Sequence, residues 1–119
     1  MSYDRAFKQL SVQELPEGGI VVRFIRRRLL ADEVVQQVRD ELQALVAHER
    51  LMVIDMSNVD AISSHAIAAL MRMHRVLKDS AGALTLCGLQ PALADTFRFL
   101  RLDRWFDLYE DLESALERE

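Results

Sequence analysis

The first quarter of the chain arranges its apolar and polar residues in a pattern that predicts two strands. Leu10 and Val12 fall on one face of a half-buried strand within residues 7–15. A turn that contains Pro16 and two glycines follows, and the β-branched run at residues 20–25 predicts the second strand. Because the connection is short, we expect these strands to form an antiparallel hairpin.

Apolar residues recur at helical spacing in three later segments and at the C-terminal end, which predicts four helices. Residues 30–47 predict an amphipathic helix whose apolar positions are Val34, Val38, Leu42 and Leu45. A second helix is expected from Ser63 or Ser64 to about Asp79, with Gly82 stopping it. A third is expected over residues 91–100, with Pro91 at its first position and Leu93, Phe97 and Leu100 on its apolar face. A final amphipathic helix uses Leu112, Ala115 and Leu116.

Short apolar runs between these helices predict the remaining strands. The runs at residues 51–56 and 83–87 are typical of strands buried on both faces, and Trp105, Phe106 and Leu108 are compatible with an edge strand. Strands that alternate with helices pair in parallel through right-handed crossovers. The sequence therefore predicts a single α/β domain over residues 1–119, with a mixed sheet of about four to five strands and about four helices.

Composition agrees with one globular domain. Half of the 119 residues are hydrophobic and 29% are charged, which excludes an intrinsically disordered chain. No apolar stretch reaches the roughly 20 residues that span a bilayer, and the first residues do not have the pattern of a secretory signal. The single cysteine, Cys87, lies in an apolar run and is expected to be a small buried hydrophobe. We therefore expect a cytoplasmic protein without membrane insertion.

Charge gives weaker information about partners. The net charge of −4 argues against nucleic acid as the partner. The run Arg26–Arg28 is a local exception, and two interpretations stay open for it. It could bind a phosphate or an acidic partner, or it could be a solvated turn between a strand and a helix.

The candidate functional segment runs from Asp55, at the end of a buried strand, to His65, in the first turn of a helix. Sites in α/β sheets gather at the carboxyl ends of strands, where this segment lies. Ser63 and Ser64 place two hydroxyls beside backbone N–H groups that have no intrahelical partner. A hydroxyl in this position can cap the helix, or it can accept a phosphoryl group. Ser63 is the better cap if Ser64 is already helical.

Enzymatic chemistry has little support in the sequence. No Ser-His-Asp arrangement with supporting motifs, no phosphate-cradling glycine loop and no carboxylate pair with a pocket is evident. His48 and His74 do not have the spacing of metal ligands. We therefore expect a protein that is not an enzyme and that needs neither a cofactor nor a metal.

Three segments together resemble the STAS family, the sulfate-transporter and anti-sigma-antagonist domains. Residues 54–59 (Ile-Asp-Met-Ser-Asn-Val) look like the family's strand-ending D-L-S segment, and residues 62–70 align with its I-D-S-S-G-L-G-A-L helix start. Residues 86–91, residues 100–106 and the terminal leucines match its closing pattern. The resemblance covers nearly the whole chain and implies the fold of that family.

Alignment with the family carries the phosphorylated serine onto Ser64 alone, and Ser63 is the second choice as an acceptor because of its position beside Ser64. Ser63 replaces the family's Asp, His65 its second serine or threonine, and Ala66 and Ala68 its two glycines. The resemblance implies a regulatory module like an anti-anti-sigma factor, which binds a switch kinase or anti-sigma factor and is controlled by phosphorylation. The residues expected to contact the partner are Asp55, Ser57, Asn58, Ser63, Ser64, His65, Ala66 and Ala68.

Plainer roles are open for the same residues. Ser64 could be an N-cap, His65 an exposed first-turn residue, and Asp55 the acceptor of an Asx-type turn. The alternative function is a structural STAS domain without a covalent switch, acting as a scaffold or as a subunit of a transport ATPase. A nucleotide-binding module has little support beyond the arginines, and a homodimer stays open.

Overall fold

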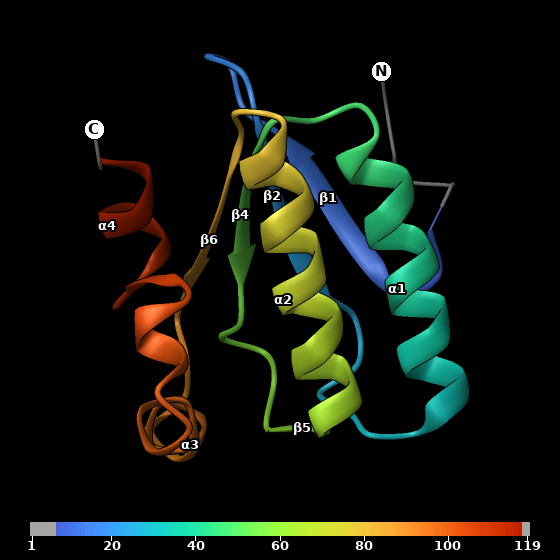
Figure 1. Cartoon of the computed structure of the whole chain (residues 1–119), viewed down its shortest axis with the longest axis vertical. Helices are drawn as coiled ribbons and strands as arrows, with labels where there is room; N and C mark the ends of the chain where they lie inside the picture. The colour runs from blue at the N-terminus through green and yellow to red at the C-terminus, as the bar shows by residue number, and fades with distance from the viewer. Residues whose placement is uncertain (1–6, 118–119) are drawn as a thin grey trace.

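The computed structural model describes residues 7–117 of the chain and folds them into a five-stranded sheet, four α-helices and one short 3₁₀ helix, together with a separate two-stranded pair (Figure 1). In chain order the elements are β1 (Leu10–Glu14), β2 (Ile20–Phe24), β3 (Arg28–Leu29), α1 (Asp32–Val46), β4 (Leu51–Asp55), β5 (Ala61–Ile62), α2 (Ser64–Asp79), β6 (Ala83–Cys87), α3 (Pro91–Phe99), η1 (Leu102–Arg104), β7 (Asp107–Tyr109) and α4 (Leu112–Leu116).

The main sheet has the strand order β1-β2-β4-β6-β7 and is mixed, as the sequence predicts. β1 pairs antiparallel with β2, with Leu10 opposite Phe24, which confirms the N-terminal hairpin. The other three pairs, β2–β4, β4–β6 and β6–β7, are parallel. Of the last apolar patch, only Leu108 lies in an edge strand, β7, whereas Trp105 and Phe106 precede that strand.

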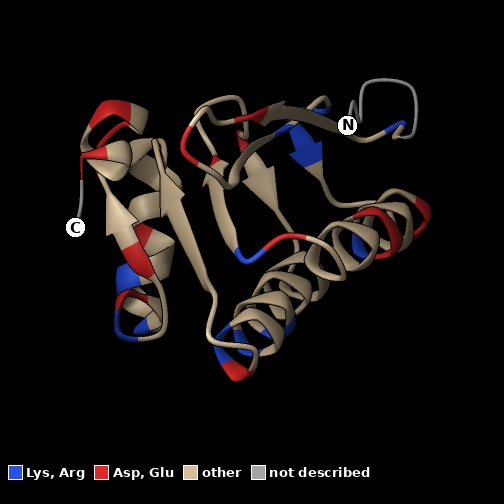
Figure 2. Cartoon of the chain, turned by 90° about the horizontal axis from the view of Figure 1, so that it is seen from above, with Lys and Arg blue, Asp and Glu red and all other residues tan. Residues whose placement is uncertain are grey.

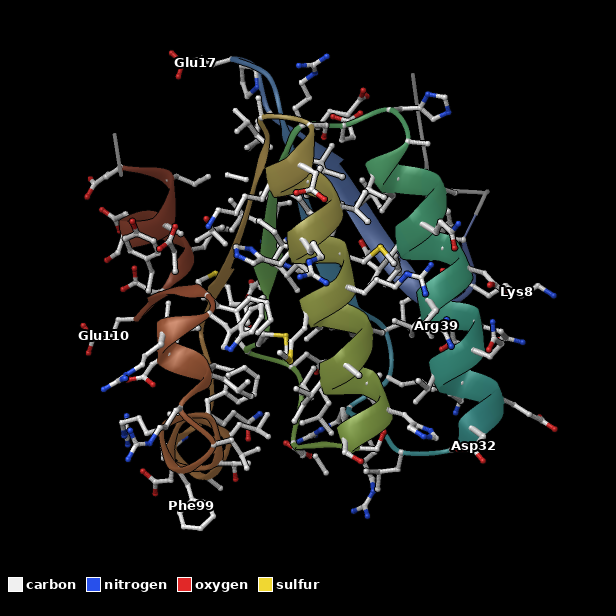
Figure 3. All side chains as sticks on the ribbon, viewed as in Figure 1. Lys8, Glu17, Asp32, Arg39, Phe99 and Glu110 are labelled. Carbon is white, nitrogen blue, oxygen red and sulfur yellow. The ribbon has the colours of Figure 1, made fainter. Side chains whose placement is uncertain are left out.

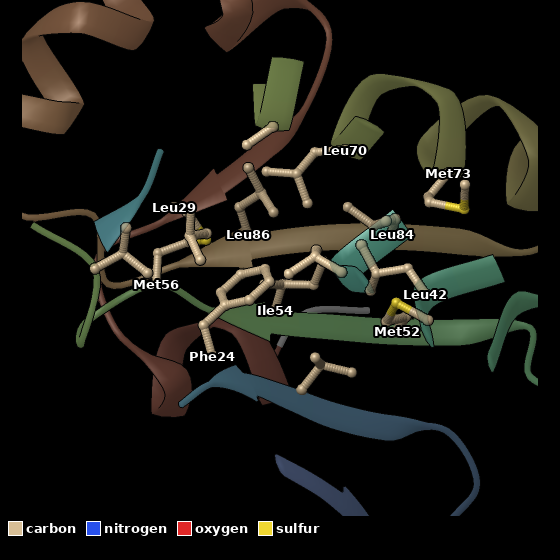
Figure 4. Close-up of a cluster of buried hydrophobic side chains, with 14 of the residues drawn as sticks. Phe24, Leu29, Leu42, Met52, Ile54, Met56, Leu70, Met73, Leu84 and Leu86 are labelled. Carbon is tan, nitrogen blue, oxygen red and sulfur yellow. The ribbon is translucent and has the colours of Figure 1, made fainter. Parts of the chain in front are cut away.

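Alternation along the central strands sends side chains to two different cores. Even-numbered residues of β2, β4 and β6 face α1 and α2, which lie side by side over one face of the sheet (Figures 1 and 2). Figure 4 shows this larger core, in which Phe24, Ile54 and Leu86 meet helix residues such as Leu42 and Leu70. The odd-numbered residues of the same strands include Val21, Val53 and Cys87, which pack with Ala115 in a small cluster beneath α4.

The structure differs from the sequence predictions at several apolar positions. In α1 it is Val35, at 4% exposure, that is fully buried, while Val34 packs at the margin of the core. Leu100 and Leu116 are 50% and 44% exposed, although both were expected on buried helix faces. Leu100 follows the last residue of α3, where the chain leaves the helix, and Leu116 is the last residue of the short α4. Their side chains therefore lie outside the apolar faces that the helical spacing suggests.

A two-residue strand pair was not anticipated by the sequence. Arg28 and Leu29 form β3, which pairs in parallel with Ala61 and Ile62 of β5. The arginine run is thus more than a solvated turn, because its last member is part of a strand. The pair joins the connection before α1 to the connection before α2, so the two helix starts are held together.

The end of α2 predicts a stabilising substitution at Ala81. The N–H of Gly82 donates to the carbonyl of Leu77 at 2.7 Å, and the N–H of Ala81 donates to that of Lys78 at 3.1 Å. This is a Schellman motif, which places Ala81 in the left-handed region at φ 63°. Because glycine adopts that region without steric cost, Ala81→Gly is expected to raise the free energy of unfolding by about 1 kcal/mol, measured by urea denaturation.

Ala44 provides the matched control for this prediction. It is exposed within α1, where the same change to glycine removes a favourable helix residue and is expected to cost about 1 kcal/mol. Opposite shifts of the two urea midpoints would support the assignment of strain to Ala81. A midpoint for Ala81→Gly at or below that of the wild type would contradict it.

Candidate functional site

The candidate site lies at the carboxyl ends of the parallel strands, in the loop that joins β4 to α2. In Figure 1 this loop and the starts of α1 and α2 lie together at the lower end of the molecule. Met56 and Val59 are fully buried and fix the loop to the larger core. The backbone of the loop residues near Met56 and Val59 is therefore held against the core, and their side chains face outward where they are exposed.

The carboxylate of Asp55, the last residue of β4, holds the start of the loop through two hydrogen bonds. One carboxylate oxygen accepts the N–H of Ser57 at 3.0 Å, which is the Asx-type turn considered from the sequence. The other accepts Nε of Arg23 from the neighbouring strand at 3.1 Å. Gly88, at φ +72°, leaves room for the carboxylate, because a Cβ there would lie 3.0 Å from its Oδ1 atom. Asp55 is 8% exposed, so it shapes the site rather than presenting a surface.

Side chains from both sides hold the rest of the loop. The Asn58 amide donates to the carbonyl of Phe24 at 2.9 Å, and the Gln90 amide donates to the carbonyl of Ser57 at 3.0 Å. Arg27 donates to both carboxylate oxygens of Asp60, at 3.0 and 3.2 Å. These bonds lower the pKa of Asp60 and keep it ionised. One arginine of the Arg26–Arg28 run therefore has an internal carboxylate partner.

The two serines at the start of α2 have different environments. Ser63 is the N-cap, and its hydroxyl oxygen accepts the N–H of Ala66 at 3.1 Å. Ser64 is the first helical residue and is exposed, and within residues 7–117 its hydroxyl makes no hydrogen bond. The N–H groups of Ser64 and His65 belong to the first turn, where the helix itself supplies no acceptor. The Ser63 oxygen is thus engaged, while the Ser64 oxygen faces solvent.

A groove between α1 and α2 continues from this point. His65 lies on its rim, with Nδ1 3.7 Å from an oxygen of Asp32 at the start of α1, and both side chains are largely exposed. Arg39 and Arg72 line the groove further along the two helices, and Figure 3 places Arg39 on α1. Ala68 also lines it, and its small side chain leaves room for another chain to approach.

Burial divides the residues expected to contact a partner. Ala66 is 2% exposed and packs into the core, so like Asp55 it offers almost no surface, and direct contact with a partner does not fit either residue. Ser63 is half-buried. The other five are exposed and form what we call the Ser64 surface: Ser57, Asn58, Ser64, His65 and Ala68.

Sequence reasoning missed the two arginines of the groove, although a signal was present. Arg39 follows Asp32 by seven residues, and Arg72 follows His65 by the same interval. Residues seven apart return to nearly the same face of a helix. Once Asp32 and His65 are known to meet at the two helix starts, the arginines are expected along the same groove.

Other reactive groups are accounted for. Cys87 is fully buried, as expected, and burial with the nearby Asp55 charge raises the pKa of its thiol to about 11, so the thiol stays protonated near neutral pH. Within residues 7–117, no group of three or more His, Cys, Asp or Glu side chains could hold a metal ion. The same part of the chain contains no helix of the length and apolarity required to cross a membrane.

Comparison with known proteins relates this geometry to a family. Curated protein sequences give no match. An anti-sigma factor antagonist from Mycobacterium paratuberculosis is 25% identical, with a TM-score of 0.76, covering 90% of this chain and 89% of that one. A STAS domain protein from Planctomyces limnophilus is 21% identical, with a TM-score of 0.78 and coverage of 92% and 96%. The phosphorylated form of the Bacillus cell fate determinant SpoIIAA is 18% identical, with a TM-score of 0.70 and coverage of 92% and 97%.

The family comparison covers most of the fold described above. The STAS domain model matches residues 17–115, from the turn before β2 into α4. That range includes the four parallel-paired strands of the sheet, both helices over the larger core and the whole Ser64 surface. On this match, the chain belongs to the STAS domain family.

Proposed function

We propose that this chain is a regulatory protein-binding module of the anti-sigma factor antagonist type, controlled by phosphorylation of Ser64. In this proposal the Ser64 surface binds a serine kinase that also acts as an anti-sigma factor. The observation that carries it is the free, exposed hydroxyl of Ser64 in the first turn of α2, next to a serine that already caps the helix. The likeness to solved anti-sigma factor antagonists, including SpoIIAA in its phosphorylated form, supports the same assignment.

The choice of Ser64 over Ser63 rests on the capping bond. A phosphoryl group on Ser63 would occupy the oxygen that accepts the N–H of Ala66, and the half-buried position gives it little room. A phosphoryl group on Ser64 leaves that bond intact. It would also lie near first-turn N–H groups at the positive end of α2, where anions are stabilised.

The chemical step is transfer of the terminal phosphoryl group of ATP to the Ser64 oxygen, with release of ADP. The hydroxyl proton passes to a base of the partner kinase, since this chain is the substrate and not the enzyme. The product carries about −1.5 to −2 additional charge on a surface of small neutral residues. A partner that fits the unmodified surface would then face an anion that it must desolvate, and it would dissociate.

Substitutions at Ser64 test the switch against the cognate serine kinase of the host. Ser64→Ala should bind the kinase normally but remain unmodified by intact mass after incubation with kinase and ATP. Ser64→Glu should bind the kinase at least about tenfold more weakly by calorimetry, because it places a charge in the interface. Glutamate at the first helical position favours α2, so the variant is expected to remain folded.

Ser114 supplies the matched control, because it also lies in the first turn of a helix but on the opposite face of the sheet. Ser114→Glu adds the same charge and should leave kinase affinity unchanged. Equal affinity of Ser64→Glu and wild type, with no modification at Ser64, would reject the switch. That result would favour the scaffold alternative, in which the family's Asp and glycine positions have changed because no covalent step is needed.

A further inference from the structure

A second surface lies between α2 and η1, and it shares Arg72 with the groove between α1 and α2. Trp105 follows η1 and lies beside α2, with a groove on each side of it. Its side chain is 49% exposed, and Val76 beside it on α2 is 40% exposed. Four cations line the same grooves. We call this set the Trp105 surface: Arg72, Arg75, Lys78, Arg104, Val76 and Trp105.

Among the residues that the structure describes, the cations of the Trp105 surface form no ion pair. Arg23, Arg27 and Arg98 each form an ion pair with an aspartate. Within residues 7–117, no carboxylate forms an ion pair with any of the four cations of the Trp105 surface, and the one acidic side chain lining the grooves is Asp79. A chain of net charge −4 therefore gathers unneutralised positive charge around its single tryptophan. Figure 2 shows basic segments on α2, whereas acidic segments gather around α4.

We propose that the Trp105 surface binds an acidic protein segment that carries an apolar anchor. Exposed tryptophan and arginine together are the residues most enriched at the energetic centres of protein interfaces. The four cations are complementary to carboxylates of a partner. The half-exposed Trp105 and Val76 are complementary to an aliphatic or aromatic side chain located between those carboxylates. Residues 72–79 span about 10 Å along α2, which matches roughly two turns of a bound helix.

Charge and size favour a peptide over nucleic acid as the occupant. A nucleic acid strand carries uniform negative charge along its length and gains affinity from an extended basic track. Here the positive charge is interrupted by acidic side chains, since Asp79 lies inside the patch and Asp103 is exposed in η1. A short acidic segment fits such a patch, because its charge can end where the cations end.

This inference is independent of the switch at Ser64. Arg72 is the cation of this surface on α2 that is nearest in sequence to Ser64, and it lies eight residues after Ser64, which is roughly 12 Å along the helix. An added charge at Ser64 is therefore beyond the ordinary screening length in physiological salt. Ser64→Glu should leave binding at the Trp105 surface unchanged, so either proposal can fail without the other.

The single tryptophan provides a direct test without a label. The probe is a short synthetic peptide of glutamate and leucine with leucines four residues apart, which has no tryptophan of its own. Titration into the full chain should give a saturable blue shift of Trp105 emission, because the indole leaves water. Arg75→Glu and Arg104→Glu retain the reporter and should each weaken binding at least about tenfold, and high salt should weaken it as well.

Three controls decide the interpretation. Arg26→Glu changes the net charge equally at an exposed position outside the patch and should bind the peptide like wild type. Equal binding of a lysine–leucine peptide would overturn the requirement for acid. Equal or tighter binding of polyglutamate or oligothymidylate would overturn the requirement for an anchor and indicate a polyanion surface. No emission change with any probe, in a chain shown to be folded by circular dichroism, would also reject the proposal.

Discussion

Replacing Gly82 with alanine is expected to lower the free energy of unfolding by about 3 kcal/mol. A Cβ at this position would lie 2.3 Å from the carbonyl oxygen of Arg50 and 3.1 Å from that of Leu77. The Arg50 carbonyl accepts the N–H of Ala83 at 2.7 Å, at the point where β4 and β6 begin to pair. The added methyl group would therefore push β4 and β6 apart where they begin to pair.

Gly18 separates this clash from the ordinary effect of losing a glycine. It lies in the hairpin turn at φ +102°, where a Cβ would meet nothing within 4 Å. Gly18→Ala should therefore cost only the strain of a left-handed backbone, about 1 kcal/mol. Urea denaturation of both variants gives the comparison. A Gly82→Ala protein no less stable than Gly18→Ala would contradict the close approach of the Arg50 carbonyl.

Ala81 and Gly82 show which features of the α2 end can be predicted from local sequence and which cannot. Gly82 was expected to stop α2, since glycine after an apolar repeat commonly ends a helix. In the structure Ala81 adopts the left-handed conformation, and Gly82 is needed for its lack of a side chain against β4. That requirement comes from Arg50, thirty-two residues earlier, and no local pattern carries it.

Helices and strands with a continuous apolar face were predictable, because the residues that face the core recur in the sequence with the period of the helix or strand. The strands β2, β4 and β6 and the helices α1, α2 and α3 follow from such patterns, with ends shifted by one or two residues. The pair β3–β5 was missed because it has only two residues per strand. Its existence depends on the positions of α1 and α2, which bring Arg28 beside Ala61.

The candidate site was predictable in outline but not in detail. Two serines before an apolar repeat identify the start of α2, yet the backbone conformation decides that Ser63 caps and Ser64 is free. The burial of Ala66 and the exposure of Ala68 depend on which side of α2 faces the sheet. That side can be read from the buried residues Ile67, Leu70 and Met73, so this distinction was available from helical spacing.

Removal of the Asp55 carboxylate is the second large expected effect, and it acts on the loop that carries the Ser64 surface. Asp55→Ala removes the acceptor for the Ser57 N–H and the ion partner of Arg23. It also leaves a small void, because the Asp55 residue is only 8% exposed. We expect a loss of about 2 to 3 kcal/mol in the free energy of unfolding. The loss is limited because the Arg23 side chain is 38% exposed and can turn toward water.

Asp55→Asn separates the two bonds. The asparagine oxygen can still accept the Ser57 N–H, as in other Asx turns, whereas its NH₂ group would face the Arg23 donor. We expect this variant to lose about 1 kcal/mol and to keep the wild-type amide shifts of residues 56–60 in a two-dimensional NMR spectrum. Asp55→Ala should move those shifts, because the first turn of the loop loses its acceptor. If both variants leave the loop amides unmoved, the carboxylate does not hold the loop, and the buried Met56 and Val59 are sufficient to fix it.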